Sequence, residues 1–239
     1  MKGSLLYEGK AKQVYRVEGE AEQLILSYKN DATAFNGKKK DQFNGKGRLN
    51  NLISANVFAY LHQHDVRSHF IKTLNDTEQL VEKTTIIPLE VVVRNVAAGS
   101  IVKRLGLEEK QPFDSPLIEL FYKNDDLNDP LINDEHAYLL ADVTEEELNV
   151  LKRMTLTVNT QLRSLFADVN LQLVDFKLEF GRRQDGSLVL SDEISPDTCR
   201  LWDRETGEKM DKDVFRQGLG DLVDVYEVIL QRLEEKAHA

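Results

Sequence analysis

The chain has 239 residues, of which 41% are hydrophobic, and its formal net charge is −10. The apolar content supports a real core, and the acidic balance argues against nucleic acid as a partner, because such proteins need a basic footprint. A single cysteine, Cys199, excludes an internal disulfide, and no stretch approaches the ~20 apolar residues of a membrane span, so we expect a cytoplasmic protein with no membrane partner.

The N-terminal part of the chain predicts strands around one helix. An apolar stripe at helical spacing predicts the helix over residues 47–64. Alternating or apolar runs predict strands at 5–17, 24–28, 70–74 and 79–83.

One turn in this part combines glycine with lysines. Gly9, Lys10, Ala11 and Lys12 lie where two strand segments meet. A hairpin over nucleotide phosphates needs close backbone approach, which glycine allows, and cationic donors, which Lys10 and Lys12 would supply from one shared face. An ordinary basic edge strand is the alternative.

A longer apolar strand is predicted over residues 86–96, with Glu90 and Arg94 embedded in it, and a short helix over 99–105 follows. Backbone N–H groups at a helix start bind anions, Ser100 can add a hydroxyl, and Arg94 can clamp a phosphate. The alternative is an N-cap role for Ser100 and a structural ion pair for Arg94.

The C-terminal part adds further strands and helices. They are a strand at 118–122, a helix from a capping box at Thr144 to about Asp168, a hairpin after it, and a final helix over 213–236 with a kink expected at Gly218 and Gly220. We predict a polar loop from Ser195 to Asp203, in which Arg200 is a second candidate phosphate ligand. Runs of strands followed by helices indicate the α+β class.

The most informative segment is the strand that ends at Gly181. Asp175, Lys177 and Glu179 alternate there with apolar residues. Because successive side chains of a strand point to opposite faces, one face packs and the other carries acid, base and acid in a row.

A hairpin after this strand predicts a metal site. Asp185-Gly186 between two strand-like runs indicates a two-residue loop, which sets Glu179 opposite Asp192, and such cross-strand partners lie ~5 Å apart. Two facing carboxylates repel unless a cation lies between them, and Mg²⁺ typically takes one or two protein carboxylates. The alternative is a solvated strand face whose charges Lys177 neutralises.

Taken together, these segments resemble one known family. Two of its signatures match Ile87–Ser100 and Val174–Gly181 closely. The family is phosphoribosylaminoimidazole-succinocarboxamide synthase, also called SAICAR synthetase. Further similar segments are Tyr7–Lys12, Lys123–Asp125, Asp192–Trp202 and Met210–Asp213, and the similarity runs from about Leu5 to Leu233.

The resemblance implies a purine-biosynthesis ligase that joins L-aspartate to the carboxylate of carboxyaminoimidazole ribonucleotide (CAIR), using ATP and Mg²⁺. It implies a two-lobed α+β fold of antiparallel sheets with flanking helices. Residues 1–85 would form an ATP-binding lobe similar to the small lobe of a protein kinase, and residues 86–239 a lobe for substrate and metal. A homodimer is the family expectation.

The resemblance also assigns roles to the residues already singled out. Those expected at ATP are Gly9, Lys10, Ala11, Lys12 and Lys123. Those expected to hold Mg²⁺ are Glu179 and Asp192. Those expected at CAIR are Arg94, Ser100 and Arg200 for its phosphate, Asp175 and Lys177 for its imidazole and the catalytic step, and Asn36 for its ribose, in a loop where some relatives have aspartate.

Two other functions compete with this interpretation. A small-molecule kinase or another ATP-dependent ligase could use a similar metal hairpin, although it would not need a second phosphate site apart from the ATP lysines. A non-catalytic nucleotide sensor would keep Lys10 and Lys12 but would not need Glu179 opposite Asp192.

Overall fold

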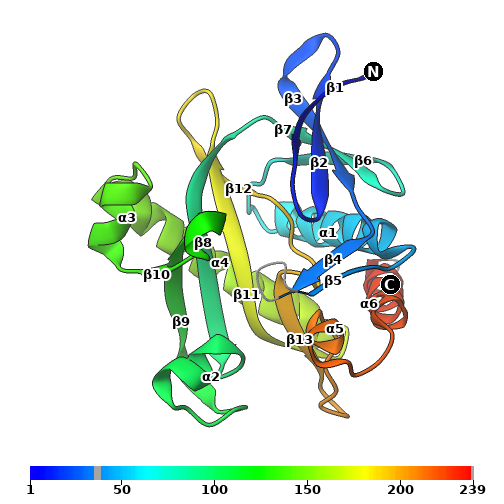
Figure 1. The fold of residues 1–239 in the computed structure, drawn as a ribbon, viewed down its shortest axis with the longest axis vertical. Helices are drawn as coiled ribbons and strands as arrows, with labels where there is room; N and C mark the ends of the chain where they lie inside the picture. The colour runs from blue at the N-terminus through cyan, green and yellow to red at the C-terminus, as the bar shows by residue number, and fades with distance from the viewer. Residues whose placement is uncertain (35–38, 238–239) are drawn as a thin grey trace.

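The computed structural model describes residues 1–34 and 39–237, so the predicted ribose contact Asn36 lies outside the described residues. A five-stranded antiparallel sheet occupies the N-terminal third of the chain (Figure 1). In spatial order its strands are β1 (Lys2–Glu8), β2 (Lys12–Val17), β3 (Glu20–Tyr28), β7 (Glu78–Glu82) and β6 (Phe70–Asn75). A separate two-stranded sheet consists of β4 (Asp31–Ala34) and β5 (Lys39–Gln42).

A six-stranded antiparallel sheet forms the second layer. Its strands are β10 (Leu131–Ile132), β9 (Pro112–Tyr122), β8 (Thr85–Val96), β11 (Leu171–Arg182), β12 (Leu188–Ser191) and β13 (Cys199–Asp203). β11 is central, because it pairs with β8 on one side and with both β12 and β13 on the other. The strand that carries the acid, base and acid pattern is therefore held along its whole length.

Helices cover these sheets and complete the core. They are α1 (Lys46–Gln63), α2 (Ser100–Leu105), α3 (Asp134–Leu140), α4 (Glu145–Asp168), α5 (Asp213–Gln217) and α6 (Leu222–Ala237), with a 3₁₀ turn at Asp125–Leu127. α4 lies against β11 and β8, and α1 contacts both α6 and α4 (Figure 1). None of the helices within the described ranges is long and apolar enough to cross a membrane.

The apolar face of β11 is buried as its alternation predicts. Phe176, Leu178 and Phe180 join one cluster with residues of α1, α4 and α6. Burying each such side chain contributes about 1.5–3 kcal/mol, so the packing fixes which face of β11 carries Asp175, Lys177 and Glu179.

The predicted start of α4 is confirmed. The Thr144 hydroxyl accepts a hydrogen bond from the backbone N–H of Glu147, and the Glu147 carboxylate accepts one from the backbone N–H of Thr144. This reciprocal pair satisfies two N–H groups that a helix start leaves unpaired.

Two C-terminal predictions are wrong. The final helix is not continuous, because α5 ends at Gly218, whose φ of 67° is left-handed, and α6 begins only at Leu222. The segment from Ser195 to Asp203 is not all loop, since β13 begins at Cys199 and pairs with β11. Glycine, free of a Cβ, ends the helix where a merely kinked one was expected.

The predicted hairpin register is also wrong, by one residue. Glu179 pairs with Ser191 instead of Asp192. The Arg183 N–H donates to the carbonyl of Ser187 at 2.9 Å, so three residues form the loop where two were predicted. β12 ends at Ser191, and Asp192 turns out of the strand with a φ of 61°.

The two large sheets divide along the chain, because β7 ends at Glu82 and β8 begins at Thr85. The α+β class with antiparallel sheets and flanking helices is as predicted. The division into lobes of residues 1–85 and 86–239 remains a proposal, since α1 from the first range packs on α6 from the second.

Candidate active site

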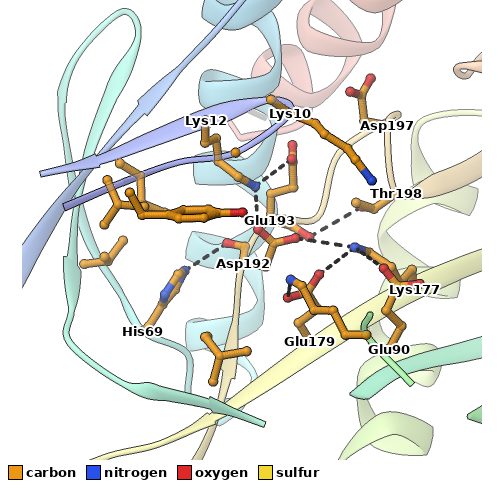
Figure 2. A pocket seen from close by; sticks show the side chains of 18 of the residues that line it. Lys10, Lys12, His69, Glu90, Lys177, Glu179, Asp192, Glu193, Asp197 and Thr198 are labelled. Atoms are coloured by element: carbon orange, nitrogen blue, oxygen red, sulfur yellow. Dashed lines mark hydrogen bonds and ion pairs between the residues drawn. The ribbon is translucent and has the colours of Figure 1, made fainter. Parts of the chain in front are cut away.

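A cavity of about 530 Å³ is lined by residues of both large sheets (Figure 2). All of the described residues predicted to contact ATP line it: Gly9, Lys10, Ala11, Lys12 and Lys123. Its apolar lining comes mainly from the five-stranded sheet and includes Val14, Leu24, Leu26, Val81 and Ile86. The cavity therefore combines an apolar wall with several ammonium groups.

Lys10 and Lys12 contribute differently. Lys10 lies in the turn between β1 and β2, and its Nζ is 2.6 Å from Asp125. Lys12 opens β2, and its Nζ is 2.5 Å from Asp192 and 2.7 Å from Glu193 (Figure 2). The pattern predicted one shared face, but the turn sends the two ammonium groups to different carboxylates.

Lysines and carboxylates from five segments meet in this cavity, and we call them the carboxylate–lysine cluster. Its members are Lys12, Glu90, Lys123, Lys177, Glu179, Asp192 and Glu193. The Nζ of Lys177 is 3.0 Å from Glu90, 2.6 Å from Glu179 and 3.8 Å from Asp192. Lys123 pairs with the other oxygen of Glu179.

Opposite charges in this cluster shift the pKa of Lys177 and that of Asp192. Burial alone would lower the pKa of Lys177, but the carboxylates of Glu179, Glu90 and Asp192 raise that pKa well above its usual value. Burial alone would raise the pKa of Asp192, but the ammonium groups of Lys12 and Lys177 lower it. Opposite charges thus outweigh desolvation at both ends of the contact.

The donor set suits a hard cation that brings other ligands with it. No group of three or more His, Cys, Asp or Glu with a metal-binding arrangement occurs in residues 1–34 and 39–237. Glu179 and Asp192 nevertheless both contact Lys177, although they are not cross-strand partners. Two carboxylates fit Mg²⁺, which usually completes its octahedron with waters and substrate phosphates.

A second cavity of about 190 Å³ lies toward the Asp175 end of the acid, base and acid pattern in β11. The predicted residues Arg94, Asp175, Lys177 and Arg200 line it. Nη1 of Arg94 and Nη1 of Arg200 each lie 2.8 Å from Oδ2 of Asp175. One buried carboxylate thus holds both candidate phosphate ligands, a link that no sequence motif indicates.

These residues belong to a longer chain of ion pairs, which we call the arginine cluster. In order its members are Arg104, Glu119, Arg94, Asp175, Arg200, Asp213 and Arg216. Burial tends to lower the pKa of Arg200, but Asp175 and Asp213 raise it. Each guanidinium of the cluster is thus held in place by at least one carboxylate.

Ser100 is held by the same cluster. Nη2 of Arg94 donates to the Ser100 hydroxyl at 3.2 Å, and Gly99 is the N-cap of α2, so the N-cap role considered for Ser100 does not occur. A Cβ at Gly99 would lie 2.5 Å from Nη2 of Arg200, and its φ is 65°. Glycine at this position lets the arginine side chain approach the backbone before α2.

Five residues line both cavities: Glu90, Lys177, Asp197, Thr198 and Arg216. The side chain of Asp197, a residue that the motifs did not single out, is 5% exposed and accepts from Lys46 at 2.7 Å and from the Tyr226 hydroxyl at 2.7 Å. A usable signal was its place in the short Ser-Pro-Asp-Thr segment between two strands.

The fold and the two adjoining cavities define an α+β protein in which lysines, arginines and carboxylates gather at the cavity walls. A family model described as SAICAR synthetase matches residues 5–233. The chain belongs to the SAICAR synthetase family, as the sequence motifs predicted.

Individual relatives agree with this assignment over nearly their whole length. A phosphoribosylaminoimidazole-succinocarboxamide synthase from Oceanobacillus iheyensis is 64% identical over 98% of this chain and 99% of that protein. One from Bacillus subtilis is 54% identical, with 98% and 96% covered. A SAICAR synthetase solved in complex with ADP has a TM-score of 0.93 and 46% identity, with 96% of this chain and 97% of that chain covered.

Proposed function

We propose that the larger cavity binds ATP, that the smaller cavity binds CAIR, and that the reaction takes place where their linings meet. Enzymes of this family join L-aspartate to the carboxylate of CAIR with ATP and give SAICAR, ADP and phosphate. The observation that carries the proposal is that Lys177, a member of the carboxylate–lysine cluster, also lines the smaller cavity together with Asp175 and Arg200 of the arginine cluster.

ATP would lie against the five-stranded sheet. The apolar side chains of Val14, Leu26 and Val81 offer a surface for the purine ring. The turn of Gly9, Lys10 and Ala11, together with Lys12 and Lys123, would surround the phosphates. That a solved relative binds ADP supports a nucleotide in this cavity.

Glu179 and Asp192 would hold Mg²⁺. When bound, the ion would neutralise phosphate oxygens and orient the transferring group. Lys12, Lys123 and Lys177, which these carboxylates contact here, would then be free to pair with phosphate oxygens instead.

CAIR would bind beside β8 and β11. Arg94, Arg200 and Ser100 would bind its phosphate, since a guanidinium matches phosphate with two parallel hydrogen bonds. Asp175 would orient both arginines. Together with Lys177 it would contact the imidazole of CAIR. Asn36 remains the proposed ribose contact.

The chemistry needs an activated carboxylate. An oxygen of the CAIR carboxylate would attack the γ-phosphorus of ATP, the bond to ADP would break, and an acyl phosphate would form. The neutral amine of aspartate would then attack the acyl carbon, phosphate would leave, and the nitrogen would lose a proton. Lys177, held between Glu90 and Glu179, would offset the charge that accumulates between the two reactants.

This account assigns the protein positioning and electrostatic stabilisation, and no nucleophile. Burial raises the pKa of the Cys199 thiol, which keeps the one cysteine in its unreactive protonated form. A buried, protonated thiol is a poor nucleophile, which agrees with direct transfer of the phosphoryl group from ATP to the substrate carboxylate.

The direct test measures ADP release by the purified protein with ATP and Mg²⁺, omitting CAIR and aspartate one at a time. We expect release that requires both, with matching formation of SAICAR. Release with CAIR alone would indicate a kinase-like activity. Nucleotide binding without release under any condition would favour the non-catalytic sensor.

A cytoplasmic location and a homodimer are also part of the proposal. A chain with a single, buried cysteine suits a reducing compartment, which supports the location. The dimer follows from the family expectation alone. Sedimentation equilibrium of the purified protein would measure the oligomeric state, and a monomer across the accessible concentrations would refute the dimer.

A further inference from the structure

Asp192 reaches the carboxylate–lysine cluster by leaving its strand. Its φ of 61° is left-handed, a backbone conformation that residues other than glycine adopt at a cost, although Asp and Asn tolerate it best. Ser191 pairs with Glu179 and shares its face of the sheet. Had Asp192 continued β12, its side chain would have pointed to the opposite face, away from Glu179. The turn instead aims its carboxylate at Lys12, 2.5 Å away.

The side chain of His69, the residue before β6, contacts the backbone at this turn. Nε2 of His69 lies 2.9 Å from the carbonyl oxygen of Asp192 (Figure 2). A carbonyl can only accept, so Nε2 must carry the proton and donate it.

His69 itself is rigidly placed. The backbone N–H of His69 donates to the backbone carbonyl of Leu190 at 2.8 Å, and the backbone carbonyl of His69 accepts from the backbone N–H of Glu82 at 2.7 Å. Its ring packs edge-on against Phe58, with ring centres 5.8 Å apart. The side chain is 4% exposed, so the donor that reaches Asp192 has little freedom to move.

From this geometry we infer that His69 is a positioning residue for the metal site: its Nε2–H holds the left-handed turn that aims the Asp192 carboxylate. The inference rests on the proposed metal role of Asp192. His69 touches neither reactant in this role, and it acts only through the backbone of the residue it holds.

Two matched variants separate the donor from the ring. Glutamine places its amide nitrogen close to where Nε2 lies, whereas asparagine reaches only about as far as Nδ1. His69→Gln can therefore still donate to Asp192, and His69→Asn cannot, while both introduce a neutral amide in the same buried place. His62→Asn is the control, because His62 bonds to Ser68 and not to Asp192.

The measurement is Mn²⁺ binding in the presence of ADP, followed by electron paramagnetic resonance, together with ADP binding without metal. We expect His69→Asn to weaken Mn²⁺ binding by about 10-fold or more, as loss of a partner that orients a metal ligand typically does, and His69→Gln and the control to change it little. ADP binding without metal should be the same in all of them.

Several results would overturn the inference. They are unchanged Mn²⁺ binding in His69→Asn, an equal loss in His69→Gln or His62→Asn, and a parallel loss of metal-free ADP binding, which indicates general damage. Asp192→Asn serves as the reference. If it binds Mn²⁺ normally, the metal assignment fails and His69 loses its role with it; if it binds weakly while His69→Asn does not, only the role of His69 fails.

Discussion

The two ends of the acid, base and acid strand differ in the sign of their surplus charge. In the carboxylate–lysine cluster, three lysines face four carboxylates. In the arginine cluster, four arginines face three carboxylates. Both clusters are partly buried, so each surplus acts at a lower effective dielectric than in bulk water.

The sign of the surplus charge decides which kind of ligand each end favours. A surplus carboxylate beside a cavity favours a cation, and a surplus guanidinium favours an anion such as a phosphate monoester. The cationic members differ in kind as well. Lysines, as compact point charges, can exchange carboxylates for phosphate oxygens, whereas arginines in a fixed chain present a geometry set in advance.

Removing negative charge from the carboxylate–lysine cluster should change activity most. We predict that Glu179→Gln and Asp192→Asn each lower kcat by about 10²–10³-fold, the loss typical of one preorganised electrostatic contact in a transition state. Each change keeps the size of the side chain but removes a negative charge that would hold Mg²⁺. Steady-state kinetics at saturating ATP, CAIR and aspartate would measure it.

Asp126→Asn is the matched control for these two variants. Asp126 is exposed and lines neither cavity, although its neighbour Asp125 lines the larger one. Near-normal kcat in Glu179→Gln or Asp192→Asn, or an equal loss in the control, would contradict the assignment of the metal to this end.

The two clusters also differ in how far the sequence could predict them. Alternation along β11 gave the face of Asp175, Lys177 and Glu179, because the apolar residues between them must be buried. The same rule failed for Asp192. A three-residue loop replaced the expected two-residue one, and contacts with distant His69 stabilise a left-handed turn that no local pattern announces.

At the arginine end, the sequence indicated which residues were unusual but not how they are joined. Arg94 stands out inside an apolar strand, and Arg200 was placed in a loop that proved to be β13. Glu119 and Asp213 link them to further arginines through strand pairing and the position of α5. Such links depend on tertiary contacts between segments far apart in the chain.

A second prediction tests whether the arginine end can take one more negative charge. Asp211 is fully buried beside this cluster, and burial, with the charge of Asp213, raises its pKa to about 7. Since the pKa in the unfolded chain is near 3.8, the folded state keeps a proton that the unfolded state has lost. Stability from this group is complete below about pH 4 and declines as pH rises through about 7.

Asp211→Asn stays neutral and removes this decline. We expect the difference in unfolding free energy, variant minus unchanged protein, to increase by about 3 kcal/mol as pH rises from 5 to 8, from 1.36 kcal/mol per pKa unit. Urea denaturation at each pH would measure the difference. Its slope with pH is decisive, because the amide also loses one of the two backbone N–H contacts that Asp211 accepts at every pH. A flat difference would show that Asp211 is ionised throughout.

The smallest predicted effect tests the geometry of the arginine end, with its charge kept. Arg200→Lys retains a cation but loses the planar fork that reaches Asp175 and Asp213 together. We expect KM for CAIR to rise about 10-fold with KM for ATP unchanged, since charged hydrogen bonds are typically worth 1.5–3 kcal/mol and the new ammonium would recover part of this. Arg204→Lys is the control, because Arg204 is exposed and lines neither cavity. An unchanged KM for CAIR would mean that charge alone, without the fork, is sufficient. A rise in KM for ATP instead would mean that Arg200 acts with the carboxylate–lysine cluster. The two clusters would then not bind separate ligands.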